Sequence, residues 1–104
     1  MERLTNQEDL MRMANTIRQD IISMLLEAGS GHSAGPLGLA DIAAALYFNV
    51  LHHNPKKPKD PDRDRLYVSP GHTAPVWYAT LARAGYFPVE ELQTLLKLGT
   101  RLQG

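Results

Sequence analysis

This chain of 104 residues contains no cysteine. The absence excludes a disulfide framework, a zinc site built on thiolates and a cysteine nucleophile. It fits a protein that works in a reducing cytoplasm, which is the location that we expect. The length suffices for one small domain and not for two.

A net charge is also lacking, since 11 basic residues balance 11 acidic ones. No long-range field therefore draws the chain toward nucleic acid or an anionic membrane surface. No apolar run is long enough to cross a bilayer, and the N-terminus, which begins Met1-Glu2-Arg3, has no apolar core of a signal peptide. We expect no nucleic-acid partner and no membrane association. Any bound anion must be held by local groups.

Strand-forming segments are scarce. Apolar residues with helical spacing, together with start and stop signals, predict helices over residues 6–29, 39–50, 75–85 and 88–99. The one good strand candidate is the apolar run of residues 66–68, which is bounded by Arg65 and by Ser69-Pro70-Gly71. The chain therefore reads as helix, helix, strand, helix, helix.

One strand cannot make a sheet, so two folds are open. The chain is either an all-α domain with one extended segment or the opening piece of a larger α/β domain. The second fold explains the lone apolar run better, because buried parallel strands have this composition. We therefore expect an α/β fold that is mostly helical in this chain, with one short strand.

A Gly-His pair, Gly71-His72, follows the predicted strand and precedes the helix that begins near Pro75. A strand, a glycine turn and a helix start form the usual geometry for a phosphate at a helix N-terminus. Free backbone N–H groups point toward the anion there, and His72 can add a side-chain donor. The structural alternative is that His72 only caps the helix or bonds a neighbouring carbonyl.

A second pair, Gly31-His32, lies in a glycine-rich loop that runs to Gly38 between two strong helical patterns. Such loops often carry function, and an imidazole can donate a hydrogen bond or move a proton near neutral pH. The structural alternative is an inter-helix turn with a surface histidine.

Other polar or aromatic groups are better explained without a ligand. His52 and His53 are neighbours at a helix end and face different ways, so they form a poor chelate. The aspartates of residues 60–64 alternate with arginines, which favours local salt bridges, and the lysines of residues 56–59 are expected on a solvated loop. Trp77 is expected in the core or in an interface. We assign no metal ligand in this chain.

Four stretches, taken in order and spacing, resemble the N-terminal part of the transketolase family. They are Ser30-Gly31-His32 through Pro36-Leu37-Gly38, Leu46-Tyr47 through Asn54-Pro55, Asp62-Arg63-Asp64-Arg65 through Gly71-His72, and Gly85-Tyr86 through Glu90-Glu91-Leu92. The combination is specific, whereas no single piece is. The tail, residues 97–104, is most similar to the split form of the enzyme, which two subunits make up.

The resemblance implies a thiamine diphosphate enzyme that transfers a two-carbon ketol unit from a ketose phosphate to an aldose phosphate. By motif matching, Gly71 and His72 bind the cofactor diphosphate, and His32 is the catalytic residue that polarises or protonates sugar oxygens. The implied partners are sugar phosphates, a C-terminal transketolase subunit and a second copy of the same subunit. Residues 1–104 are then a partial diphosphate-binding domain, truncated at its C-terminal end.

The chain also departs from the family pattern. Ser33 and Ala34 stand where the family usually has proline and glycine, and Pro70 replaces a usually polar residue. The family's magnesium ligands are expected outside this chain. We therefore expect the chain alone to lack activity and tight cofactor binding. Unpartnered apolar faces should also make it self-associate or leave it marginally stable.

Two alternatives stay open at this point. One is a non-catalytic remnant that acts as an assembly module, and the other is a different thiamine-dependent ketol or aldehyde transferase. The reading frame beyond Gly104 separates the enzyme from the remnant. Continuation into His-Pro and then Gly-Asp-Gly favours the enzyme, whereas a stop favours the remnant.

Overall fold

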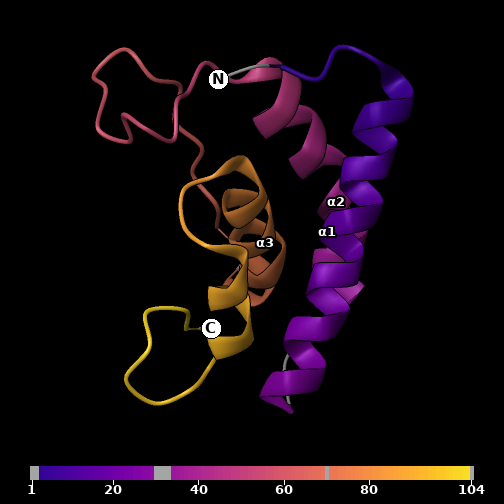
Figure 1. The fold of residues 1–104 in the computed structure, drawn as a ribbon, viewed down its shortest axis with the longest axis vertical. Helices are drawn as coiled ribbons and strands as arrows, with labels where there is room; N and C mark the ends of the chain where they lie inside the picture. Colours follow the sequence, from indigo (N-terminus) through magenta and orange to yellow (C-terminus); the bar gives the residue numbers. More distant parts are fainter. Residues whose placement is uncertain (1–2, 30–33, 70, 104) are drawn as a thin grey trace.

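A computed structural model describes residues 3–29, 34–69 and 71–103 (Figure 1). The elements in chain order are α1 (Gln7–Ala28), α2 (Ala34–Ala45), the π-helical turn η1 (Leu46–Val50), the 3-10 turn η2 (Gly71–Thr73), α3 (Ala74–Ala84) and the 3-10 helix η3 (Val89–Thr94). Between η1 and η2, residues 51–69 run along the outside of the helices before the chain turns back into α3 (Figure 1).

The limits of α1 agree with the sequence prediction. At its start, the Asn6 side chain accepts a hydrogen bond of 2.7 Å from the backbone N–H of Glu8. At its end, Gly29 takes the left-handed conformation, with φ 76°, and its N–H donates to the carbonyl of Leu25. The face between these caps buries Ala14, Ile17, Ile21 and Met24.

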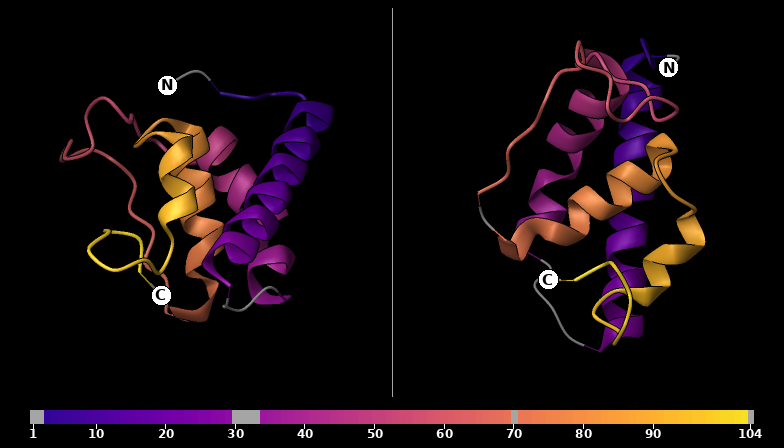
Figure 2. Two further views of the ribbon diagram at one scale, coloured as in Figure 1. Left: turned by 60° about the horizontal axis from the view of Figure 1, so that its bottom comes forward. Right: turned by 90° about the vertical axis from the view of Figure 1, so that its left-hand side faces the viewer.

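The core forms where α1, α2 and α3 meet, and η3 packs against both α1 and α3 (Figure 2). Small side chains on α2 and α3 let the helix backbones approach closely, namely Ala40, Ala43, Ala44, Ala79 and Ala82. The buried Thr80 hydroxyl donates to the carbonyl of Val76 at 2.6 Å, so this polar group is satisfied within its own helix.

The predicted α/β fold is wrong for the part of the chain that the structure describes, because those residues form helices and turns and no strand. Residues 66–68 are irregular, and Tyr67 is 86% exposed. A strand needs a neighbour to accept and donate ladder hydrogen bonds. No backbone hydrogen bond joins residues 65–69 to any described residue. An apolar composition alone therefore does not make this run a strand.

The predicted fourth helix is also shorter than the pattern indicated. Only Val89–Thr94 is helical, as a 3-10 helix, and Leu96 and Gly99 then take positive φ values of 62° and 82°. These conformations turn the tail back on the molecule, so the side chain of Leu102 is buried. The leucine stripe contributes to the core through η3 and the returning tail instead of through a long helix.

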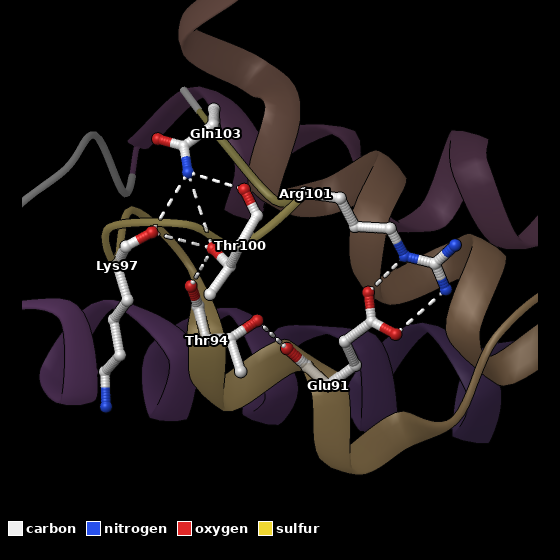
Figure 3. Close-up of polar contacts among 6 residues, drawn as sticks. All are labelled: Glu91, Thr94, Lys97, Thr100, Arg101 and Gln103. Atoms are coloured by element: carbon white, nitrogen blue, oxygen red, sulfur yellow. Dashed lines mark hydrogen bonds and ion pairs between the residues drawn. The ribbon is translucent and has the colours of Figure 1, made fainter.

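The tail, residues 95–103, is held by side chains that bond to its own backbone (Figure 3). The Gln103 amide donates to the carbonyls of Lys97 and Thr100 at 3.1 and 2.9 Å. The Thr100 hydroxyl bonds the Thr94 carbonyl at 2.9 Å, and Arg101 forms a two-pronged ion pair with Glu91. This network fixes the tail although it contains no regular helix.

Candidate functional site

The start of α3 carries the predicted phosphate-binding residues. His72 lies in η2 directly before the helix, and Thr73 is the N-cap residue of α3. Thr73 is buried, and its hydroxyl accepts a hydrogen bond of 3.3 Å from the indole N–H of Trp77. Pro75 occupies the first turn, where the missing N–H costs no helical hydrogen bond. The predicted helix start is therefore confirmed.

The start of α2 lies against this turn. A Cβ atom built on Gly35 would lie 3.2 Å from Cδ2 and 3.4 Å from Nε2 of the His72 ring, and 3.3 Å from Cγ2 of Thr73. Such distances are closer than ordinary van der Waals contact, so a glycine at this position lets the two segments approach. The loop that carries the first Gly-His pair thus leads into a helix end that contacts the second pair.

Open space lies beside Gly71. A Cβ built there would meet no described atom within 4 Å. A mainly apolar hollow of about 200 Å³ borders it, lined by Val68, Gly71, Ala74, Trp77, Tyr78 and Leu81. A helix N-terminus, an adjacent imidazole and free room form a suitable set for an anionic group.

The sequence-predicted site residues are only partly visible. Gly71 and His72 are exposed at the start of α3, as a ligand site requires. His32 lies outside the described residues. Sequence reasoning missed the role of Gly35, since the glycine-rich loop gave no sign that this glycine meets His72. The only signal in the sequence is the number of glycines in this loop, because glycine is common where two backbone segments approach closely.

His53 is a structural residue, as the sequence analysis favoured. Its Nε2 lies 2.5 Å from the carbonyl oxygen of Tyr47, which can only accept, so Nε2 carries the hydrogen. In the neutral ring, Nδ1 then accepts from the Tyr86 hydroxyl at 2.6 Å. Burial raises the pKa of Tyr86, which keeps this hydroxyl protonated as a donor. His52 is exposed and its ring shares no partner with His53 among the described contacts.

The aspartates of the polar connection bond mainly to backbone groups, so the expectation of local salt bridges is wrong for them. Asp60 Oδ1 accepts from the backbone N–H of Asp62 at 3.0 Å. Asp64 Oδ2 accepts from the backbone N–H of His52 at 2.7 Å, and the Asp64 N–H returns a bond to the His52 carbonyl. These carboxylates close turns. Among the described residues, no three metal-binding side chains gather in one place.

Two larger hollows, of about 330 and 380 Å³, flank His53. Both are lined in part by Tyr47 and His53. Both hollows lie along the irregular connection, and the smaller of them shares Leu81 with the hollow beside Gly71. Within the described ranges, no helix is both long and apolar enough to span a membrane.

The chain is similar to a known protein family over most of its length. Residues 10–104 match the family described as transketolase, thiamine diphosphate binding domain. The chain is 45% identical over 96 residues to the 6-deoxy-6-sulfo-D-fructose transketolase subunit SqwG of Clostridium sp. (strain MSTE9). The aligned residues cover 92% of this chain and 35% of that protein. It is 40% identical over 93 residues to transketolase 1 of Escherichia coli (strain K12), with 88% of this chain and 14% of that protein covered.

The transketolase of Pongo abelii is 38% identical over 91 residues, which cover 88% of this chain and 15% of that protein. The chain thus spans about a third or less of the length of these relatives. Since the family match covers nearly the whole chain and includes both Gly-His pairs, the chain belongs to the transketolase family, in its thiamine diphosphate-binding domain.

Proposed function

We propose that this chain forms the diphosphate-holding part of an enzyme that transfers a two-carbon ketol unit from a ketose phosphate to an aldose phosphate. The observation that carries the proposal is the close approach of Gly35 to His72, beside the open space at Gly71. It joins the segment after the first Gly-His pair to the segment that contains the second. The family match to a thiamine diphosphate-binding domain supports the same reading.

The residues at the start of α3 suit the diphosphate end of the cofactor. The positive end of an 11-residue helix favours an anion. His72 supplies a side-chain N–H, and Gly71 leaves room for phosphate oxygens to approach the backbone. The bound cofactor supplies the electron sink for breaking a carbon–carbon bond. We assign His72 and Gly71 to binding, and His32 to hydrogen bonding and proton transfer at the sugar.

The remaining requirements of the reaction point to further protein. We propose that residues outside this chain would hold Mg²⁺, and that the ion would help to bind the diphosphate. We also propose that a C-terminal transketolase subunit and a second copy of the same subunit complete the enzyme, which acts on sugar phosphates in the cytoplasm. The similarity to a protein that is itself named a subunit supports this arrangement, as does the small share of the longer relatives that the chain covers.

The proposal is tested by His72→Ala in the enzyme reconstituted from the complete reading frame of this chain and its partner subunit. Calorimetry with thiamine diphosphate and Mg²⁺ should show at least about tenfold weaker binding, because a hydrogen bond to a charged group contributes about 1.5–3 kcal/mol. His52→Ala is the matched control, since His52 is exposed and far along the chain from α3. Equal affinity of the His72→Ala and His52→Ala enzymes would overturn the assignment.

The 104-residue chain by itself gives a second test. Without magnesium ligands, a helix end and two histidines cannot offset the hydration of a diphosphate, so we expect no tight binding of the cofactor and no ketol transfer. Micromolar binding in the same calorimetric experiment would show that the magnesium ligands are not required outside this chain.

A further inference from the structure

Trp77 is the single tryptophan of the chain and lies one helical turn after Thr73. Its indole Nε1 donates to Thr73 Oγ1 at 3.3 Å. Its ring is tilted against that of Tyr47, with 6.5 Å between the centroids, and it lines the apolar hollow next to Gly71. The binding roles proposed above for Gly71 and His72 do not include this residue.

The side chain of Thr73 is held from two directions. Its hydroxyl does not cap the helix, although Thr73 is the N-cap residue; it accepts the Trp77 indole N–H instead. Its methyl group faces Gly35, where an added Cβ atom would lie 3.3 Å from Cγ2 of Thr73, closer than ordinary van der Waals contact. Thr73 is also buried, so rotation of this side chain would require movement of its neighbours.

The backbone of Thr73 links this restraint to the site. Thr73 is the last residue of η2, follows His72 directly and has φ −92° and ψ 3°, between the turn and the helix proper. A change in the Thr73 side chain would therefore move the turn that presents Gly71 and His72. Trp77 does not need to touch a ligand to affect the direction of these groups.

We propose that Trp77 is a positioning residue for the diphosphate: its indole N–H fixes the Thr73 side chain, and through it the turn that carries His72. This role rests on the proposed function of Gly71 and His72. Trp77 acts only through Thr73, and it is not a catalytic residue. Because the hydrogen bond to Thr73 requires an indole N–H, a phenylalanine at position 77 would retain an aromatic ring without this restraint.

The test uses Trp77→Phe, Thr73→Val and the double variant in the reconstituted enzyme, with thiamine diphosphate and Mg²⁺ in the calorimeter. Each single variant should bind about three- to tenfold more weakly, the loss expected for one neutral hydrogen bond. The double variant should bind no more weakly than Thr73→Val, because both changes remove the same bond. Thr73→Ser keeps the hydroxyl and should bind within about twofold of the parent enzyme, so it reports rescue.

Tyr86→Phe is the matched control, since it removes a hydrogen bond of an aromatic side chain, to His53 Nδ1, and Tyr86 does not line the hollow beside Gly71. Parent-like affinity of Trp77→Phe, or losses for Trp77→Phe and Thr73→Val that add in the double variant, would overturn the proposal. His72→Ala distinguishes a failure of the positioning role of Trp77 from a failure of the proposed diphosphate site. If it weakens binding while Trp77→Phe does not, only the positioning role fails. If it has no effect either, the proposed diphosphate site fails.

If Trp77→Phe does not fold, Thr73→Val and Thr73→Ser test whether binding needs the Thr73 hydroxyl, which accepts the indole N–H. A loss of affinity in the valine variant that the serine variant does not share supports the hydroxyl's role. Equal affinities of the two folded variants overturn it. Thermal unfolding of each variant establishes that the compared enzymes are folded.

Discussion

Two irregular segments of this molecule both contain several apolar residues, but they differ in their hydrogen bonds and in the burial of their side chains. The tail, residues 95–103, bonds to itself and to η3, and it buries Leu102, which is 3% exposed (Figure 3). Residues 65–69, which lead into the Gly71-His72 turn, make no backbone hydrogen bond to a described residue. They expose Tyr67 and Val68.

The difference lies in the side chains that bond to backbone carbonyls: the tail has several beside its buried leucine, and residues 65–69 have none among the described contacts. Thr100 bonds the carbonyl of Thr94 at the end of η3, and Gln103 bonds the carbonyls of Lys97 and Thr100 within the tail, so the tail returns and places Leu102 in the core. Residues 65–69 have no comparable side-chain donor bonded to their carbonyls among the described contacts. The segment nearest the proposed site therefore contributes little to holding the fold.

Leu102→Ala should have the largest effect on this comparison. The leucine is buried in the core cluster, so its truncation should lower the free energy of unfolding by about 2–5 kcal/mol. Tyr67→Ala is the matched control on the other segment, and its free energy of unfolding should change by no more than about 0.5 kcal/mol because the ring is exposed. Urea unfolding of both variants measures the difference, and similar losses would contradict the comparison.

The sequence predicted the helices well wherever local chemistry decides the outcome. The ends of α1 at Asn6 and Gly29 and the end of α3 at Gly85 follow from cap residues, and the structure places them there. The tail could not be predicted in this way. Its path depends on a positive φ at Leu96, a conformation that leucine rarely adopts and no local signal indicates.

The residues assigned to the candidate site stay a prediction, and the structure adds contacts that the sequence did not indicate. The Gly-His motif and the helix start predicted where an anion would sit. The strand predicted before them is absent from the described residues. A strand forms only beside a pairing segment, and the apolar pattern of residues 66–68 does not show whether such a segment is present. Likewise, the approach of Gly35 to His72 joins positions 37 residues apart in number, and helix propensity carries no information about such a pairing.

Two glycine substitutions in α2 test the approach of Gly35 to His72, and their expected effect on stability is smaller than that of Leu102→Ala. Gly38→Ala should stabilise the protein by about 0.5–1 kcal/mol, because alanine favours the helix and its Cβ would meet nothing within 4 Å. Gly35→Ala has the same helical benefit, but its Cβ would press on the His72 ring and the Thr73 methyl. We expect it to gain less stability.

Thermal unfolding measures the two stabilities, and the NMR signals of the His72 ring report its displacement. Those signals should shift in Gly35→Ala and stay in place in Gly38→Ala. Equal stabilisation together with unmoved His72 signals in both variants would show that Gly35 is not needed for the approach of α2 to η2.

The smallest expected effect concerns the surface ion pair that closes the tail. The hydrogen bond from Arg101 lowers the pKa of Glu91 below its ordinary value of 4.5. The pair therefore stabilises the fold above the unfolded-state pKa, and this contribution disappears as the pH falls through the lower folded-state pKa. Because the Arg101 side chain is exposed and that of Glu91 is partly so, salt should weaken the effect.

Arg101→Gln should return the pKa of Glu91 toward 4.5, as measured by NMR titration of its carboxyl group. Glu27 is the internal control, because Lys97 lowers its pKa through a separate ion pair that the substitution leaves in place. A Glu91 pKa that stays low in Arg101→Gln would mean that the backbone around η3, and not Arg101, stabilises the carboxylate. The tail would then owe its order to Gln103, Thr100 and the burial of Leu102, with the ion pair adding nothing to the contrast with residues 65–69.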